Sequence, residues 1–305
     1  MGMRKLLLIV TILFSLYSSG QSPMFKLIAK KASSCSYLLD QYSGAAAAYS
    51  LRLLDCDYAG DAIRVRRSSD NTEDDIGFVN GNLDTASLKT FVGTGGSDNG
   101  FIVTWYDHSG NSLHMTQATQ ANQAKIIDAG VVLRVNSLPS ALFAGKGYSV
   151  AVSFTFSELS AFAISTPTSA ASFSRILSTK TVGIGPDYSG TIIPILRDGT
   201  TANWGSFRSG AMRATYTGVS STVLNLFSSV VNTTTLYNQL NNDTEVTYST
   251  TLSGSCEYLL LNCSQPNGST EGINGYISEV IYYNNNQYTN KSGIKTNINT
   301  YYSIY

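Results

Sequence analysis

Residues 275–283 read GYISEVIYY, the clearest strand pattern in the sequence, and a short helical pattern follows them. Tyrosine, isoleucine and valine favour extended backbone, so the run predicts a strand. Glu279 is its acidic residue, and we expect it to face solvent or to meet an arginine. Further on, Ile294, Ile298 and Tyr301 recur at i, i+4 and i+7, which predicts a short closing helix. This end of the chain therefore predicts a sheet protein with a C-terminal helix.

Shorter strand patterns precede this run and are separated by turns rich in glycine, serine and asparagine. The internal helix is expected at residues 85–92, capped by Asp84, with an apolar stripe that includes Leu88 and with Gly93 at its end. Many short strands with few helices predict two packed sheets. The expected fold class is an all-β, two-sheet sandwich with one short internal helix and a short C-terminal helix. The other strands are expected at residues 48–54, 62–67, 76–79, 101–106, 148–156, 175–178, 191–197, 212–216, 223–231, 235–240, 245–248 and 258–262.

The composition is poor in charge and rich in small polar residues. Basic and acidic residues number 20 each, so the formal net charge is zero, and charged residues make up 13% of the chain. A chain without a basic excess lacks the electrostatic footprint of a nucleic-acid-binding protein. Serine, threonine and asparagine fill 93 of the 305 positions. Such a surface of hydroxyls and amides is typical of strand-and-turn proteins, often extracellular ones.

The first twenty residues have the order of a secretory signal: two basic residues, an apolar run at residues 6–17, then small residues. The apolar run is shorter than the ~20 residues that cross a bilayer, and no later stretch approaches that length. We therefore expect a secreted protein without a membrane span in its mature chain. The alternative is a start at Met24. The expected organisation is a signal peptide at 1–20, a leader at 21–34 and a single β-sandwich domain at 35–305.

The spacing of the four cysteines argues against a disulfide between Cys256 and Cys263. If residues 257–262 form a strand, Cys256 and Cys263 are separated by about 23 Å at ~3.3 Å per residue, which is too far for a disulfide. Cys35 and Cys56 are the expected pair in an oxidising compartment, and four free thiols are the alternative. With two histidines and no CxxC motif, the sequence does not predict a zinc site.

Two stretches resemble concanavalin-A-like (laminin-G-like) sandwiches. Residues 275–284, with the closing helix, look like the last strand and helix of that fold. Residues 148–156 followed by residues 175–178 (RILS) resemble the strand pair that opens it. The resemblance implies a concanavalin-A-like jelly roll. That fold is shared by lectins, glycanases and virion fibre parts, so it says little about the ligand.

A second set of segments follows one another in the first half of the chain: 62–70 (AIRVRRSSD), Ile76 and Gly77, the helix region 83–91, 104–111 (TWYDHSGN) and 116–118 (TQA). With these segments, residues 45–120 resemble the N-terminal half of the arabinofuranosidase B catalytic domain, with His108 where that family has glutamine. The resemblance implies a related fold and is also seen in bacterial and phage proteins without an established activity.

The catalytic motif of that family has no counterpart in this sequence. The resemblance implies a nucleophilic glutamate in an Asn-Ala-Glu-Thr-like segment, an adjacent cysteine pair and a later acid/base, and none of these occurs. Asp187, in the glycine-rich segment GPDYSG, is the one acid near the expected place. It is a candidate ligand contact together with Tyr188. A retaining glycosidase needs two carboxyl groups ~5–5.5 Å apart, but the acidic run at residues 73–75 is better explained as a solvated turn beside arginines.

Asp107, His108 and Asn111 lie in one tight turn (DHSGN) that carries several oxygen donors. We expect its side chains to bond their own backbone in an Asx-type turn, although they are also candidate ligand contacts. No cofactor is expected, and calcium is the ion that these oxygens would fit. A Ser-His-Asp triad is disfavoured because adjacent residues rarely align as nucleophile, base and orienting group.

The two tryptophans are expected in different environments. Trp105 follows strand alternation and is expected in the core. Trp204 sits in the loop-like segment TANWGS and is the better candidate to stack on a sugar ring. The alternative is a ring that folds back onto the sheet.

The sequence therefore favours an extracellular or virion-surface module that recognises a glycan or a cell-surface polysaccharide without catalysis. The hydroxyl-rich surface and the missing catalytic motif support this interpretation. The first alternative is a glycoside hydrolase of the α-L-arabinofuranosidase type that acts on arabinose-containing polysaccharide. The second is a purely structural fibre component.

Overall fold

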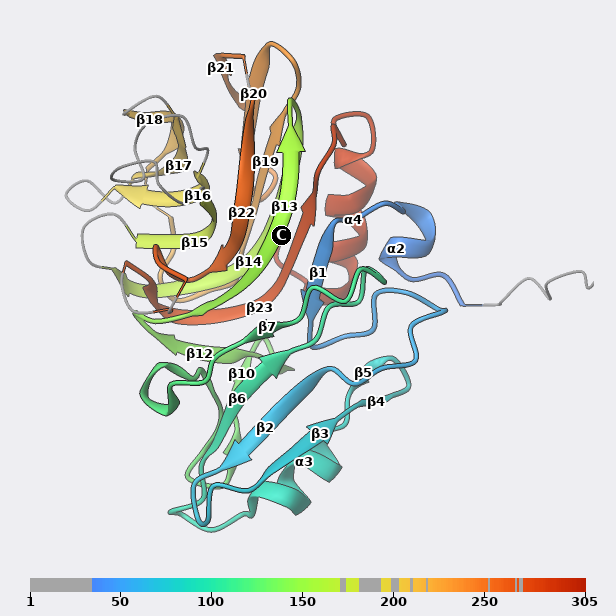
Figure 1. The fold of residues 1–305 in the computed structure, drawn as a ribbon, viewed down its shortest axis with the longest axis vertical. Coiled ribbons are helices and arrows are strands. Elements are labelled where there is room, and N and C mark those ends of the chain that lie inside the picture. The colour runs from blue at the N-terminus through green and yellow to red at the C-terminus, as the bar shows by residue number, and fades with distance from the viewer. Residues whose placement is uncertain are drawn as a thin grey trace, which may run out of the picture. The chain divides into compact units, whose positions relative to one another are not determined.

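The computed structural model describes residues 35–305 apart from 171–173, 181–192, 199–202, 209–210, 218, 252, 267 and 269–270. One compact unit spans Ser36–Tyr305. It consists mainly of antiparallel strands, and nineteen of the described strands join in one continuous, curled sheet (Figure 1). The prediction of an all-β sandwich is confirmed. None of the described helices is long and apolar enough to span a membrane. The helices are α2 (Leu38–Gln41), α3 (Thr85–Val92) and α4 (Lys291–Tyr302).

One layer of the sandwich is built on two long strands, β14 (Leu159–Ala170) and β23 (Ile273–Tyr283), which pair along most of their length. Further strands continue the layer on the free edge of β14, and two more pair with the other edge of β23. The strands beyond β14 are β19 (Asn225–Val231), β20 (Thr235–Leu240) and β21 (Val246–Ser249), and those beyond β23 are β1 (Ala47–Ser50) and β12 (Ala141–Ala144).

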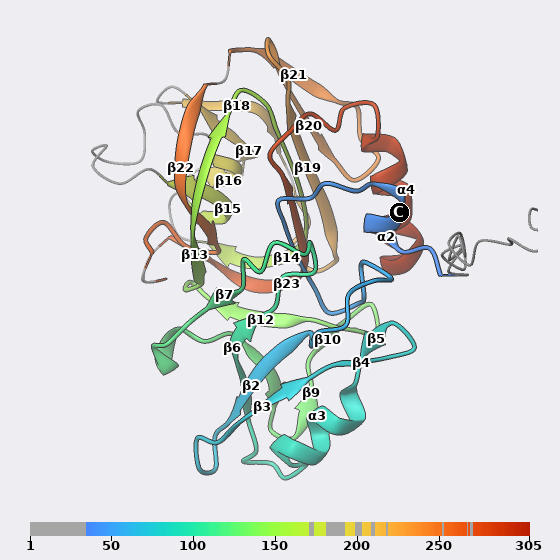
Figure 2. The ribbon, with the colours of Figure 1, turned by 45° about the vertical axis from the view of Figure 1, so that its right-hand side comes forward.

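The second layer faces the first, as Figure 2 shows for β13 and β22 opposite β19 and β20. The rings of Phe154 and Tyr282 stack at 6.3 Å in the core between the layers. In pairing order the second layer contains β13 (Tyr148–Phe156), β22 (Gly254–Leu261), β15 (Ser174–Lys180), β16 (Ile193–Asp198), β17 (Asn203–Arg208) and β18 (Ala211–Tyr216).

Beyond β12 the sheet continues into the N-terminal half of the chain, where α3 contacts β2 and β3. Four strands follow β12 in pairing order: β8 (Lys125–Asp128), β6 (Gly100–Trp105), β2 (Ile63–Arg67) and β3 (Glu73–Ile76). The short elements are β4 (Phe78–Val79), β5 (Asn82–Leu83), β7 (Met115–Thr116), the 3-10 turn η1 (Gln120–Asn122), β9 (Val131–Val132), β10 (Arg134–Val135) and β11 (Leu138–Pro139).

Strand β23 is apolar because both of its faces are buried. Val280 and Tyr282 belong to the core between the two layers. Ile281 and Tyr283 alternate with them and belong to a second apolar cluster, which also contains Ile294, from α4. The helix therefore covers the outer face of the layer that contains β23. Burial of the apolar stripe of α4 against a sheet is what stabilises so short a helix.

Both predicted helices are observed, whereas the four-residue α2 was not predicted. Helix α3 has the predicted bounds, and Asp84 accepts hydrogen bonds from the backbone N–H groups of Ala86 and Ser87. Helix α4 is present, but Tyr302 rather than Tyr301 takes the third buried position of its stripe. The coarser assignment, a β-sandwich, is observed, and the finer concanavalin-A-like topology stays a prediction.

The cysteines differ in state. Cys35 and Cys56 are disulfide-bonded. Cys256 and Cys263 are free and buried, on β22 and just after it.

Candidate functional site

A groove of about 540 Å³ lies at the helices α2 and α4. Helix α4 presents Ile294 and Ile298 to the second apolar cluster, whereas Thr296 and Thr300 are exposed. This division follows the 3.6-residue period of the helix. The groove is lined by Gln41, Tyr42, Arg52, Gly293, Thr296, Asn297, Thr300 and Tyr301.

Beneath the groove lies a buried ion pair between Arg52 and Glu279. The guanidinium Nε donates to Glu279 Oε2 at 2.7 Å, and Nη2 donates to Oε1 at 2.9 Å. The hydroxyl of Ser50 also donates to Glu279 Oε2, at 2.7 Å. The two charged side chains are 8% and 1% exposed. Burial acts to lower the pKa of Arg52, but Glu279 outweighs it and the pKa is raised, so the guanidinium stays charged.

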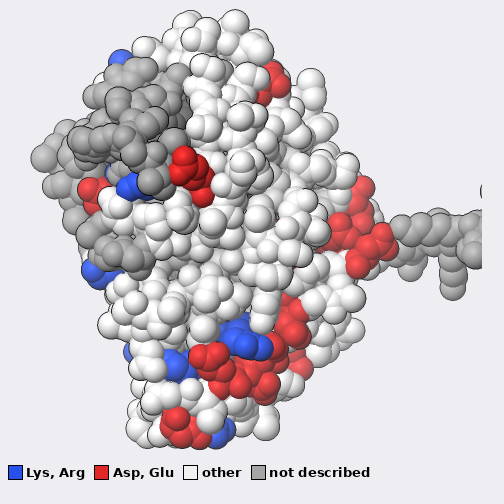
Figure 3. All heavy atoms as spheres, in the orientation of Figure 1, with Lys and Arg blue, Asp and Glu red and all other residues white. Residues whose placement is uncertain are grey.

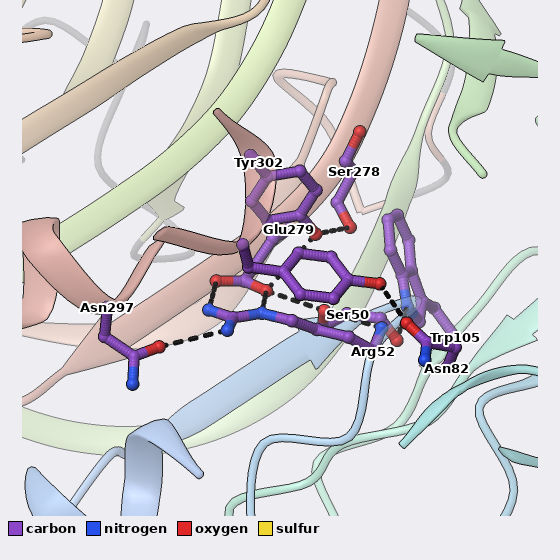
Figure 4. A network of polar contacts seen from close by, with 9 residues as sticks. Ser50, Arg52, Asn82, Trp105, Ser278, Glu279, Asn297 and Tyr302 are labelled. Atoms are coloured by element: carbon purple, nitrogen blue, oxygen red, sulfur yellow. Dashed lines mark hydrogen bonds and ion pairs between the residues drawn. The ribbon is translucent and has the colours of Figure 1, made fainter. Parts of the chain in front are cut away.

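The guanidinium of Arg52 is also held from the groove side, and Figure 4 shows it between Glu279 and Asn297. Its Nη1 donates to Asn297 Oδ1 at 3.0 Å. The guanidinium carbon lies 4.8 Å from the ring centroid of Tyr301 and 5.6 Å from that of Tyr302. Such contacts between a cation and an aromatic face are attractive. The aromatic rings and the amide thus fix the groove floor in one arrangement.

Apart from the guanidinium of Arg52, the groove offers neutral polar groups and aromatic surface. Burial raises the pKa of Tyr301, whose hydroxyl stays protonated and donates to Asn82 Oδ1 at 2.6 Å. The described lining of the groove contains no Asp or Glu. Both oxygens of the nearest buried carboxylate, Glu279, accept hydrogen bonds from Arg52. The described lining can therefore hydrogen-bond polar groups of a ligand and contact its apolar surface.

The turn residue Asp107 is buried, and both oxygens of its carboxylate accept two hydrogen bonds each. Oδ1 accepts hydrogen bonds from the N–H groups of Ala48 and Ser109. Oδ2 accepts from the Ser109 hydroxyl and from the N–H of Leu113. Asn111 likewise donates to the carbonyl oxygens that precede β1, at 3.0 Å each. The bonds of Asp107 to Ser109 and Leu113 lie within the turn segment, as the Asx-turn interpretation expected, whereas the bonds to β1 and the residues before it tie the turn to another part of the chain.

His108 is buried beside two aromatic rings. It stacks on Tyr58 at 4.6 Å and meets the edge of Phe78 at 5.3 Å. Burial lowers the pKa of His108 to about 3, and the nearby Arg52 and His114 act in the same direction. Neither ring nitrogen has a hydrogen-bond partner among the described residues. His108 is neutral and forms no hydrogen bond with Asp107 or Ser109, so these three residues do not form a Ser-His-Asp triad.

Trp204 lies on β17 instead of in a loop, and its side chain is only 3% exposed. Its ring packs at 5.0 Å from that of Phe227, and both rings line a small pocket. The local composition suggested a loop, but pairing with β16 and β18 makes the segment a strand. The alternative of a ring folded onto the sheet is the one observed. Asp187 and Tyr188 lie outside the described residues.

The acidic run at residues 73–75 is not the predicted turn but part of strand β3, where Asp75 and Glu73 pair with the arginines of β2. Arg64 binds Asp75 through Nε at 2.9 Å and Nη2 at 2.6 Å, and Tyr106 donates to the same carboxylate. Burial, followed by the charges of Asp75 and Asp74, raises the pKa of the nearby Asp61.

The charged side chains visible in Figure 3 gather mainly in its lower half, and most of the remaining surface drawn is uncharged.

The sequence did not point to Arg52, Tyr42 or the helix surface around Asn297 as a site. One signal was present: an acid within the apolar strand 275–283 needs a partner when the strand is buried on both faces. The expectation that Glu279 meets an arginine is the alternative that the structure shows.

No protein-family model matches the sequence, and no curated protein matches it. The fold is similar to that of solved arabinofuranosidases. An enzyme of glycoside hydrolase family 54 soaked with a cyclic sulfate inhibitor gives a TM-score of 0.66 at 16% identity, over 83% of this chain and 62% of the other. An arabinofuranosidase complexed with arabinofuranosyl-α-1,2-xylobiose gives a TM-score of 0.64 at the same identity and coverage. Trypanosoma rangeli sialidase gives 0.43 at 12% identity, over 68% of this chain and 32% of the other.

These comparisons concern the fold. This chain spans 62% of the length of the arabinofuranosidase chains that it matches. The resemblance noted for residues 45–120 therefore extends, at the level of architecture, to most of the chain.

Proposed function

We propose that this protein is a carbohydrate-recognition module that binds a neutral glycan in the groove at α2 and α4 and does not hydrolyse it. The observation that carries the proposal is the state of Glu279. It is the buried acid beneath the groove, and a two-pronged ion pair with Arg52 removes it from proton transfer. The amides, hydroxyls and tyrosine rings of the lining supply what a sugar needs for binding alone.

Arabinose-containing oligosaccharides are the first ligands to test, because one arabinofuranosidase of similar fold was solved with arabinofuranosyl-xylobiose. We propose a location outside the cell or on the surface of a virion, which the signal-like N-terminus supports. A glycan-binding module acts where polysaccharides are exposed, so the two parts of the proposal are consistent.

Two exposed helical threonines give a matched test. Thr300 on α4 lines the groove, whereas Thr90 on α3 is outside its lining, and both hydroxyls donate to the carbonyl four residues earlier. Binding to a glycan array, then to the best oligosaccharide by calorimetry, is measured for wild type, Thr300→Trp and Thr90→Trp. We expect Thr300→Trp to weaken binding at least about ten-fold by filling the groove, and Thr90→Trp to leave it unchanged. Equal binding by both variants, or no glycan bound by wild type, would overturn the proposal.

The second candidate function is hydrolysis of an arabinofuranoside. Besides the fold, one observation favours it: Asp61 has a raised pKa beside Asp75, which stays paired with Arg64. A carboxyl pair with separated pKa values is how glycosidases divide acid and nucleophile roles. Turnover of an aryl arabinofuranoside that is lost in Asp61→Asn would establish the hydrolase and contradict the binding-only proposal.

A further inference from the structure

A second groove, of about 460 Å³, lies on the N-terminal part of the sheet, away from α2 and α4. Its side chains form one row across four neighbouring strands, because Arg66 on β2 pairs with Phe101 on β6, Phe101 with Lys125 on β8, and Lys125 with Leu142 on β12. Directly paired residues of antiparallel strands point to the same face. The row therefore presents two cations and two apolar side chains together. The groove is lined by Arg66, Phe101, Gln120, Ala121, Gln123, Lys125, Leu142 and Ala144.

Arg66 is a buried cation that is bound to neutral groups. It is 6% exposed, and its Nε and Nη1 donate to the amide oxygens of Gln123 and Asn71, at 2.9 and 2.7 Å. No carboxylate among the described residues lies within ion-pair distance of it. Burial lowers the pKa of Arg66, and the charge of Glu73 opposes this only in part. Arg52, by contrast, is paired with an acid. A buried charge without a counter-ion is costly, and an incoming anion would offset that cost.

Lys125 brings a second positive charge close to the ring of Phe101. The guanidinium carbon of Arg66 lies 4.8 Å from the ring centroid of Phe101, and Lys125 Nζ lies 5.7 Å from it. Lys125 also pairs with Asp128, but these side chains are 29% and 49% exposed. Exposed pairs of this kind contribute little, so Lys125 can exchange that partner for a ligand anion.

We propose that this groove binds the carboxylate of an acidic saccharide of the uronate type. Nη2 of the Arg66 guanidinium, for which the described residues provide no partner, and Lys125 Nζ would each donate a charge-assisted hydrogen bond to the carboxylate. Phe101 and Leu142 would contact the apolar face of the sugar ring, and Gln120 would hydrogen-bond its hydroxyls. The site is separate from the groove at α2 and α4, so it stands whether or not that groove binds a glycan.

Glu73, at one end of the row, provides a second variant with the opposite expected effect. Glu73 on β3 pairs with Arg66 at the far end, is exposed, and would repel a bound carboxylate. Binding of a galacturonate trisaccharide is measured by calorimetry for wild type, Lys125→Gln, Glu73→Gln and the control Lys89→Gln, an exposed lysine of α3 outside the groove. We expect Lys125→Gln to weaken binding about five-fold, Glu73→Gln to tighten it about two-fold, and Lys89→Gln to change nothing.

Two further ligands separate the chemistry of the site from simple charge attraction. A neutral galactose trisaccharide should bind at least about ten-fold more weakly than the galacturonate, and sodium sulfate should compete only weakly with it. The proposal is overturned if the neutral trisaccharide binds equally well, if sulfate binds as tightly as the saccharide, or if Lys125→Gln behaves like Lys89→Gln. Thr300→Trp, which blocks the other groove, should leave galacturonate binding unchanged. Loss of galacturonate binding in Thr300→Trp would assign the ligand to the other groove and contradict this proposal.

Discussion

Arg52 and Glu279 are 227 residues apart in the chain, yet they meet through two hydrogen bonds of 2.7 and 2.9 Å beneath a groove. The contact joins the segment after β1 to β23, the strand that pairs with β1. Since Asn297 and Tyr301 also contact Arg52, the ion pair fixes α4 to the sheet as well. The same interaction therefore stabilises the fold and shapes the groove floor.

Removal of one partner of this pair should destabilise the protein strongly. Arg52→Met leaves Glu279, which is 1% exposed, as a buried charge without a cation. We expect a loss of about 3–5 kcal/mol in the free energy of unfolding. The double variant Arg52→Met/Glu279→Leu should lose less than the single one, because no charge remains buried. Urea denaturation measures both, and a double variant that loses as much as the two single variants combined would contradict the prediction.

The buried His108 should make stability depend on pH. The folded protein holds the pKa of His108 at about 3, compared with an ordinary value of 6.5. Between these values the unfolded chain binds more protons than the folded one, so stability falls as the pH is lowered from 6.5 toward 3. One such group contributes up to ~1.4 kcal/mol per pH unit.

His108→Phe keeps an aromatic ring next to Tyr58 and Phe78 and removes the proton-binding group. Urea denaturation between pH 7 and pH 4 should therefore show a shallower decline for His108→Phe than for wild type. The unfolding free energy of wild type minus that of the variant should fall as the pH is lowered. Parallel pH profiles for the two proteins would show that His108 is not held neutral by the fold.

The two free cysteines should be unreactive in the native protein. Burial raises the pKa of Cys256 to about 11 and that of Cys263 to about 12. The thiolate is the reactive form, and at pH 8 it is scarce for both groups. We expect no reaction with Ellman's reagent over minutes, and two thiols per chain after unfolding without reductant. A rapid native reaction would place at least one of these sulfurs at the surface.

Local patterns in the sequence predicted the elements whose cause is local. Helix α3 has the predicted bounds because Asp84 caps it and Gly93 ends it, both through contacts within a few residues. Strand β23 was predicted from its own apolar residues. Trp204 was misplaced because its six-residue context resembles a loop, while the strand is formed by pairing with β16 and β18.

The groove could not be predicted in the same way. Its floor depends on the long-range contact of Arg52 with Glu279, and its wall depends on Tyr302, not Tyr301, turning into the core. That one-residue difference leaves Tyr301 free to line the groove. A periodicity argument locates a helix face only to within a residue, which is enough for the fold and too coarse for the site.

The central place of β23 has a consequence for how the chain is made. This strand pairs with β1, β12 and β14, and it follows all three of them in the chain. The edge that each of these three strands turns to β23 therefore stays unpaired until residues 273–283 have been synthesised, so assembly of the layer is a non-local event. Nascent chains that stop before residue 273 should consequently depend on chaperones to avoid aggregation, because these edges still lack their native partner.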